Sequence, residues 1–259
     1  MGSKFYPEFM NEQIIWSADL EWPILKEVVD SHSLPKGTVI KLDRYFLEKN
    51  PKSIIQYVQE HGYHVFADAK ISEIPDKTIL ITELYLEYKP WMLNVMADIC
   101  STGKTAADNP KEVDALKRFA DKCAAVGTKS CAVTVLTSKT AEMCHRQFNC
   151  DPETQVLTYV DLMTECGLTD IVCSPKEAKV IRMNSKYDNL CINTPGVRLP
   201  DTSKDDQQRV MTPHNALDVG ADRLVIGRNL TEGDEVDIVV RVRRNYRRIL
   251  DNIRSEDGA

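Results

Sequence analysis

Residues 65–75 read VFADAKISEIP, and this stretch decides how the rest of the chain is interpreted. Its first three residues are apolar, as in a buried strand, and Asp68 and Lys70 follow at a spacing of two. Side chains two apart in a strand point to the same face, so a carboxylate and an ammonium should project together. Pro75 cannot donate to a strand ladder, which places Glu73 in the loop beyond the strand. A bare D-x-K is more often a surface ion pair, and the surrounding chain decides between the two interpretations.

Short apolar runs alternate with longer segments of helical periodicity along the whole chain. Strands are expected at residues 14–18, 38–42, 65–70, 91–97, 130–136, 170–173, 190–193 and 223–226, and helices at 21–31, 51–62, 75–88, 111–126, 152–166, 175–183, 212–219 and 234–253. Such alternation argues for a parallel sheet covered by helices, and about 250 residues is the size of a closed barrel. We therefore predict an α/β fold, a single (β/α)8 TIM barrel, with residues 1–259 as one domain. The alternative is an open doubly wound sheet, but no G-x-G-x-x-G follows the first strand.

Composition describes an ordinary globular protein, with 42% apolar and 28% charged residues among 259. The net charge of −6 gives no general attraction to nucleic acid. No run approaches the roughly 18 apolar residues of a membrane span, and the N-terminus lacks the apolar core of a secretory signal. The eight cysteines form no C-x-x-C, and several lie inside apolar runs. We expect a protein of the reducing cytoplasm with no nucleic-acid or membrane partner.

Ionisable residues follow the first three predicted strands, where each strand gives way to a loop. Asp19 follows the first strand, Lys41 lies at the end of the second, and Asp68 and Lys70 end the third. In a barrel, chemistry sits at these ends, on the C-terminal face. Neighbouring strands would bring the four residues into an alternating array whose charges offset one another. Four such residues at the same ends of consecutive strands are hard to explain as solvated surface.

Later strand ends carry residues suited to a polar, phosphorylated ligand. Thr137 and Ser138 follow the fifth strand and offer small hydroxyl groups. TPGVR, which ends in Arg198, follows the seventh, and Gly227 with Arg228 follows the eighth. The loops after the seventh and eighth strands are the usual phosphate site of such barrels. Glycine allows close backbone approach and arginine suits bidentate phosphate contacts, so a phosphate grip is predicted here.

Several segments now resemble one known family, that of orotidine 5′-monophosphate decarboxylase. The matching segments are AVTVLTS (132–138), GLTDIVCSPKEA (167–178), INTPGVR (192–198), DDQQRVMTP (205–213) and GADRLVIGRNLT (220–231), beside the D-x-K-x-x-acid motif of residues 68–73. The combination of TPGVR, DQ-x-R and GR is much more specific than any one piece. The resemblance implies a homodimeric carboxy-lyase that converts orotidine 5′-monophosphate to UMP, the last step of de novo pyrimidine synthesis, with no cofactor and no metal.

The resemblance also implies roles for individual residues. Lys70 would donate a proton to pyrimidine carbon 6, and Asp68 would crowd the departing carboxylate and hold Lys70. Lys41 would bind ribose and Asp68, Asp19 a ribose hydroxyl, and Glu73 would act across the dimer. The substrate-binding set would be Asp19, Lys41, Thr137, Ser138, Pro195, Arg198, Gln207, Gly227 and Arg228, in which Ser138 meets the base and Gln207, Arg198 and Arg228 meet the phosphate.

The chain departs from the family pattern near the ribose and the dimer edge. Glu73 stands where the family has Asp, Asp43 where it usually has Gly, Met96 where it has His, and Lys77 where it has Thr. Two alternatives therefore stay open. One is a magnesium-dependent relative acting on a sugar phosphate, such as 3-keto-L-gulonate 6-phosphate decarboxylase or hexulose-6-phosphate synthase. The LTS and DQ-x-R segments argue against this alternative. The other is a non-catalytic nucleotide-binding barrel, against which the retained four-residue array argues.

Overall fold

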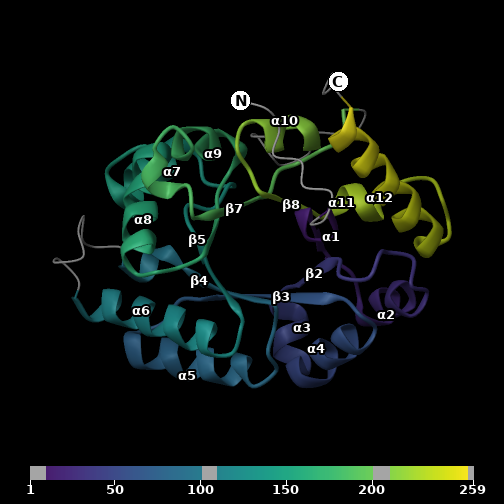
Figure 1. The fold of residues 1–259 in the computed structure, drawn as a ribbon, viewed down its shortest axis with the longest axis horizontal. Coiled ribbons are helices and arrows are strands. Elements are labelled where there is room, and N and C mark those ends of the chain that lie inside the picture. Colours follow the sequence, from purple (N-terminus) through teal and green to yellow (C-terminus); the bar gives the residue numbers. More distant parts are fainter. Residues whose placement is uncertain (1–9, 101–109, 201–210, 256–259) are drawn as a thin grey trace.

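Parallel strands close into a barrel in sequence order, with β1 hydrogen-bonded to both β2 and β8 (Figure 1). The computed structural model describes residues 10–100, 110–200 and 211–255. The strands are β1 (Ile14–Ser17), β2 (Val39–Leu42), β3 (His64–Ile71), β4 (Met92–Met96), β5 (Lys129–Val133), β6 (Asp170–Val172), β7 (Cys191–Thr194) and β8 (Arg223–Ile226). The predicted (β/α)8 barrel is confirmed.

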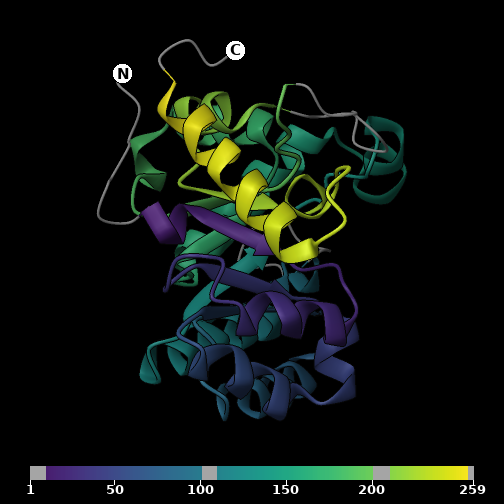
Figure 2. The same cartoon turned by 90° about the vertical axis from the view of Figure 1, so that its right-hand side faces the viewer.

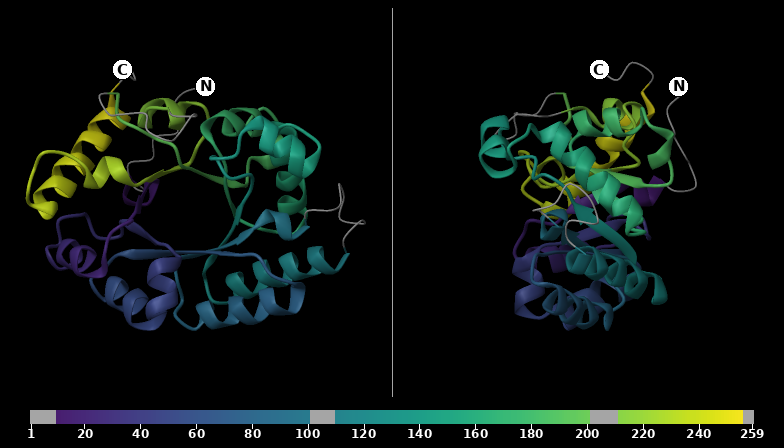
Figure 3. Two further views of the ribbon diagram at one scale, coloured as in Figure 1. Left: turned by 180° about the vertical axis from the view of Figure 1, so that it is seen from behind. Right: turned by 90° about the vertical axis from the view of Figure 1, so that its left-hand side faces the viewer.

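Helices surround the strands in a ring (Figures 1 and 3). They are α1 (Met10–Gln13), α2 (Trp22–Asp30), α3 (Arg44–Lys49), α4 (Pro51–Glu60), α5 (Pro75–Leu86), η2 (Ala97–Cys100), α6 (Pro110–Ala125), α7 (Ala141–Phe148), α8 (Pro152–Glu165), α9 (Pro175–Ile181), η4 (Ser185–Tyr187), α10 (Pro213–Asp218), α11 (Arg228–Thr231) and α12 (Ile238–Arg254). None of the described helices is long and apolar enough to cross a membrane.

Helix caps explain where the structure differs from the sequence prediction. The last helix begins at Ile238 instead of 234, because the Asp237 carboxylate accepts from the backbone N–H groups of the first turn. Several short helices, α3 and α7 among them, were not predicted. Asp43 caps α3 by accepting from the Tyr45 N–H at 3.1 Å, and Thr140 caps α7. Asp43, one of the departures from the family pattern, therefore has a local structural role.

Two apolar layers hold the barrel together. Most of the core lies between the outward faces of the strands and the helices. A second, smaller cluster fills the barrel itself, from Ile15, Val39, Phe66, Met92, Cys131 and Val225. Burying a side chain such as Phe66 stabilises the fold by roughly 1.5–3 kcal/mol. The packed interior leaves the ends of the strands as the place for a cavity.

Helix α12 and the α5–α6 pair lie on opposite sides of the barrel (Figures 1 and 3). Helix α12 crosses the outside of the barrel and packs against α2, α10 and α11 (Figure 2). Its Val242, Tyr246, Ile249 and Ile253 are buried, as the sequence pattern predicts. Arg243, Arg244, Arg247 and Arg248 occupy its exposed face.

Candidate active site

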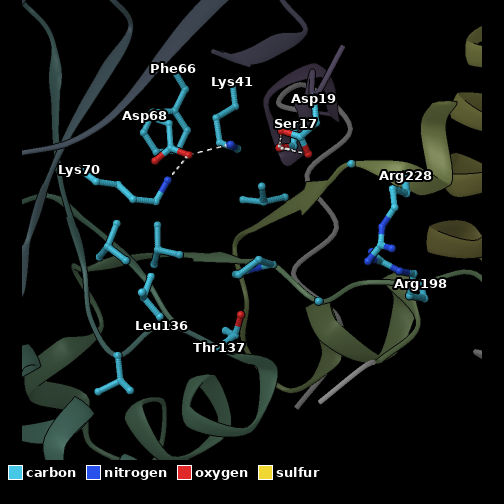
Figure 4. A pocket seen from close by; sticks show the side chains of 17 residues that line it. Ser17, Asp19, Lys41, Phe66, Asp68, Lys70, Leu136, Thr137, Arg198 and Arg228 are labelled. Atoms are coloured by element: carbon cyan, nitrogen blue, oxygen red, sulfur yellow. Dashed lines mark hydrogen bonds and ion pairs between the residues drawn. The ribbon is translucent and has the colours of Figure 1, made fainter. Parts of the chain in front are cut away.

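A cavity of about 290 Å³ opens at the C-terminal ends of the strands (Figure 4). Nine of the residues predicted from the sequence line it: Asp19, Lys41, Asp68, Lys70, Thr137, Pro195, Arg198, Gly227 and Arg228. They come from strand ends and loops around the whole barrel, so the topology brings together residues as far apart in the chain as Asp19 and Arg228. This is the face on which barrel enzymes carry their chemistry.

Asp68 is the centre of an ion cluster at one end of the cavity. The Nζ atoms of Lys41 and Lys70 lie 2.7 Å and 2.6 Å from the same carboxylate oxygen, Oδ2. The other oxygen, Oδ1, accepts from Asn94 Nδ2 at 2.7 Å. The Asp68 side chain is only 5% exposed, and that of Lys41 is 12% exposed. Charged groups this buried are tolerated when paired and hydrogen-bonded, as these are.

The two buried members of the cluster hold each other in the charged state. Burial alone would raise the pKa of Asp68, but the two lysines outweigh it and bring the pKa down to about 2. Burial alone would lower the pKa of Lys41, but Asp68, Asp19 and Asp43 outweigh it, and the pKa lies above its ordinary value. The site therefore presents a fixed carboxylate and a fixed ammonium at neutral pH.

The backbone of Lys70 is in the left-handed region, with φ of 45°. Pairing between β3 and β4 shifts register here, from Ala67↔Leu93 to Ile71↔Val95. The Lys70 N–H donates to Asn94 Oδ1 at 2.7 Å. Asp68 and Lys70 thus share a face, as predicted, but through a bulged strand and not through regular alternation.

Asp19 lies beside Lys41 in Figure 4, on the side away from Lys70, and accepts a hydrogen bond from Ser17. The Ser17 hydroxyl lies 3.1 Å from both carboxylate oxygens. A Cβ at Gly227 would lie 3.2 Å from Asp19 Oδ2, so a side chain at this position would crowd the carboxylate. Asp19 is exposed, and its charge helps to raise the pKa of Lys41. The predicted four-residue array therefore consists of three residues in direct contact, Lys41, Asp68 and Lys70, with Asp19 beside them.

Two arginines lie together at the other end of the cavity (Figure 4). Arg198 follows β7 and is 7% exposed, and its N–H donates to Met211 O at 2.9 Å. Arg228 is the first residue of α11, directly after Gly227. Asn229 of α11 accepts from the Leu199 N–H at 2.7 Å and so ties the loop after β7 to the short helix after β8. Two guanidinium groups on linked loops can grip a phosphate.

The arrangement can stabilise negative charge that develops on a bound ligand. A preorganised ammonium next to a reacting carbon lowers the energy of a carbanion-like transition state and can then protonate it. The arginines would hold an anionic group at a distance from that carbon. Among the described residues, no three His, Cys, Asp or Glu side chains are grouped to hold a metal ion.

Comparison with known proteins identifies the family. The model of the orotidine 5′-phosphate decarboxylase / HUMPS family matches residues 12–241. The chain belongs to this family. It is 33% identical over 199 residues to orotidine 5′-phosphate decarboxylase of Pseudomonas savastanoi pv. phaseolicola, covering 76% of this chain and 81% of the relative. The enzyme of the same name from Chromobacterium violaceum is 33% identical over 198 residues, covering 76% of each chain.

A solved structure shows the same fold. Orotidine 5′-phosphate decarboxylase from Lactobacillus acidophilus superimposes with a TM-score of 0.72 at 22% identity, over 93% of this chain and 99% of that one. Together, these findings make this family member a carboxy-lyase.

Two described residues that were assigned from the resemblance stand apart from the cavity. Ser138 is exposed beside Thr137 and does not line it. Glu73 is also exposed, in a shallow surface depression with Ile74, Ile99 and Glu112. Gln207 lies outside the described residues. The four departures from the family pattern are likewise outside the cavity lining, since Asp43 caps α3 and Lys77 is exposed on α5.

Two polar residues of the site were missed from the sequence. Ser17 and Asn94 contact Asp19 and Asp68, yet both lie within strands that read as apolar runs. Asn94 is fully buried inside WMLNVMA. A buried polar residue needs partners, so an amide in the middle of an apolar strand is a signal that could have found it.

Proposed function

We propose that this family member decarboxylates orotidine 5′-monophosphate to UMP, as the last step of de novo pyrimidine synthesis. The observation that carries the proposal is the division of the cavity: the Lys41–Asp68–Lys70 cluster at one end and Arg198 with Arg228 at the other. The nucleotide has a carboxylate on its ring and a phosphate on its ribose. Each end of the cavity therefore meets the group that its charges suit.

In the proposed mechanism, Lys70 is the proton donor to pyrimidine carbon 6. Loss of carbon dioxide moves negative charge onto this carbon, and the Lys70 ammonium stabilises that charge and then protonates it. Asp68 crowds the departing carboxylate and holds Lys70, and Lys41 with Asp19 binds the ribose. Thr137 and Pro195, which line the cavity, meet the base, and Gln207, Arg198, Gly227 and Arg228 meet the phosphate. Phosphate binding energy lowers the barrier by holding the loops in place.

No organic cofactor or metal enters this mechanism, because the charge required at the reacting carbon is that of Lys70. The test is the loss of orotidine monophosphate absorbance with purified protein and EDTA. Full turnover in EDTA is the expected result. Activity abolished by EDTA and restored by magnesium would instead move the protein to the sugar-phosphate members that the family description also includes. Binding without turnover would indicate a non-catalytic nucleotide-binding barrel.

We further propose that residues 1–259 form one barrel domain and act as a homodimer in the cytoplasm. Supporting the dimer, α5 presents exposed Leu80 and Leu84, and Ile74 beside it is 67% exposed. Glu73 precedes this helix, is exposed and does not line the cavity of its own chain, as expected of a residue used by a neighbouring subunit. Five of the cysteines whose side chains are described are free, which suits a reducing compartment: Cys123, Cys131, Cys166, Cys173 and Cys191.

A further inference from the structure

Asn94 is a fully buried amide in the middle of β4, and it does not line the cavity. Its side chain contacts both charged residues of the β3 motif. Asn94 Nδ2 donates to Asp68 Oδ1 at 2.7 Å, and Asn94 Oδ1 accepts from the Lys70 N–H at 2.7 Å. A carboxylate can only accept and a backbone N–H can only donate, so these partners fix the orientation of the amide.

Asn94 also fills the irregular part of the barrel wall. Between the register pairs Ala67↔Leu93 and Ile71↔Val95, residues 68–70 of β3 stand opposite Asn94 alone. The ladder is interrupted there, and Lys70 takes a positive φ that a lysine rarely adopts. The side-chain oxygen of Asn94 replaces the missing ladder acceptor. The bulge and the Asp68 carboxylate are thus held by one amide.

We propose that Asn94 is a positioning residue for decarboxylation, which locks the bulged Lys70 backbone and the Asp68 carboxylate in one geometry. This inference rests on the proposed function. Without the amide, the Lys70 ammonium would no longer be fixed relative to the reacting carbon, and the preorganisation that stabilises the transition state would be reduced. The arginines at the far end of the cavity would be unaffected. Asn94 should therefore matter for kcat far more than for KM.

The charges around Asp68 allow a sharp test with Asn94→Asp. Lys41 faces Asp68 from β2, Lys70 from its own strand, and the buried Cys131 from β5, while Asp19 and Asp43 act on Lys41. A carboxyl at position 94 would be buried beside the Asp68 carboxylate, and both conditions raise its pKa. When protonated, it can donate to Asp68 and accept from Lys70, as the amide does. When ionised, it repels Asp68.

The experiment measures kcat and KM on orotidine monophosphate from pH 5 to 8 for wild type, Asn94→Asp, Asn94→Ala and Asn193→Asp. Asn193 is the matched control: it is a fully buried asparagine of β7 whose amide donates to the buried Asp170. For Asn94→Asp we expect kcat to fall about 10²-fold at pH 8, as for one lost electrostatic donor. The deficit should shrink at least about tenfold toward pH 5, with KM changed by less than about threefold.

The control variants separate positioning from stability. Asn94→Ala should lose kcat at every pH, because it cannot be rescued by a proton. Asn193→Asp should lower the unfolding temperature without a pH-dependent loss of kcat. UMP binding by calorimetry shows that each variant is folded. If Asn94→Asp stays within about threefold of wild type throughout, or shares a pH-independent deficit with Asn193→Asp, Asn94 is not a positioning residue.

The proposed function fails separately, if the wild-type protein does not consume orotidine monophosphate. Hydrogen exchange of the Lys70 amide then still tests the geometry. The amide should be protected in wild type and in Asn193→Asp, and unprotected in Asn94→Ala. Equal protection in all three would overturn the inference.

Discussion

Both lysine ammonium groups of the site contact one oxygen of Asp68, and its other oxygen accepts from Asn94. A single buried carboxylate thus compensates two cations and is itself fixed by three donors. Removing one of these partners leaves a buried charge less compensated, which lowers the stability of the fold. Removing a lysine that acts on the transition state lowers the rate of reaction and not the affinity for substrate. These two consequences can be measured on different variants.

Lys70→Ala should abolish turnover while leaving nucleotide binding measurable. The loss in kcat should exceed the ~10²–10³ typical of one electrostatic donor, because the proton source is removed as well. UMP affinity, measured by calorimetry, should change little, since the phosphate grip remains. Arg228→Ala is the complementary variant and should mainly raise KM. If both variants lose only affinity, the assigned roles are wrong.

Lys41→Met should lower the free energy of unfolding by about 3–5 kcal/mol at pH 7, because the buried Asp68 charge keeps only Lys70 as a counter-ion. In wild type, the depressed pKa of Asp68 contributes stability above pH 3.8 that is lost as the pH falls toward 2. In the variant, the pKa of Asp68 rises, because one of its two counter-ions is missing. The difference in unfolding free energy between wild type and variant should therefore shrink as the pH falls below that raised pKa, where the carboxyl of the variant is protonated. Denaturant unfolding of both proteins at pH 7 and pH 4 measures this difference.

The control for Lys41→Met is Lys26→Met, which breaks the exposed Lys26–Asp30 pair. Exposed pairs of this kind contribute about 0–1 kcal/mol. Equal losses in the two variants would contradict a special role for the buried cluster.

At the scale of elements, strand β3 shows how far sequence patterns reach. The apolar run and the spacing of Asp68 and Lys70 predict the strand and a shared face, and both are confirmed. The alternation of side chains along β3 does not predict the bulge, because the bulge depends on a contact from another strand. The left-handed backbone of Lys70 is held by the side-chain amide of Asn94 in β4. Short helices such as α3 are also hard to predict. The six residues of α3 are too few to show helical periodicity, and its start is set by the Asp43 cap. Ser138 shows that motif position alone does not place a side chain in the cavity.

The loop from β3 to α5 carries the prediction for Glu73. The Thr78 hydroxyl donates to Glu73 O at 2.9 Å, which ties the loop backbone to α5. With the backbone held, a glutamate reaches one methylene further than an aspartate. Glu73→Ala should impair kcat/KM, and Glu73→Asp should also be slower than wild type, by up to ~10²-fold for a shift of about 1 Å.

Glu87→Asp is the control for this loop, since Glu87 is exposed at the other end of α5. It should leave kcat/KM unchanged. A Glu73→Asp variant faster than wild type on orotidine monophosphate would show that the glutamate is not accommodated by the loop. A screen of other nucleoside 5′-monophosphates would then be the next step.

At the scale of the whole molecule, the two sides of the barrel differ in surface character. Helices α12 and α5 lie on opposite sides of the barrel (Figure 3). The exposed residues of α12 include four arginines, whereas those of α5 include two leucines. Exposed apolar side chains gathered on one helix mark an interaction surface more often than scattered ones do. The proposed dimer would bury this side and leave the arginine face in solvent.

Leu84→Glu should weaken the proposed dimer and lower activity together, because we propose that Glu73 acts across the interface. Multi-angle light scattering and kcat/KM at a series of protein concentrations measure both effects. Val240→Glu, on the exposed side of α12, should change neither. A fully active monomer at assay concentration would contradict the cross-subunit role.

The pairing of β1 with β8 has a consequence for how this chain reaches its native state. Ile15 and Val225 are register partners, although about 210 residues separate them. All other neighbouring strands follow one another along the chain, so they can associate as each strand–helix unit forms. The pairing of β1 with β8 must wait until β8 is available, and it closes a loop that contains almost the whole chain. The slow step of refolding is therefore expected to be the joining of the two ends of the sheet, late on the pathway and after most of the helices have formed.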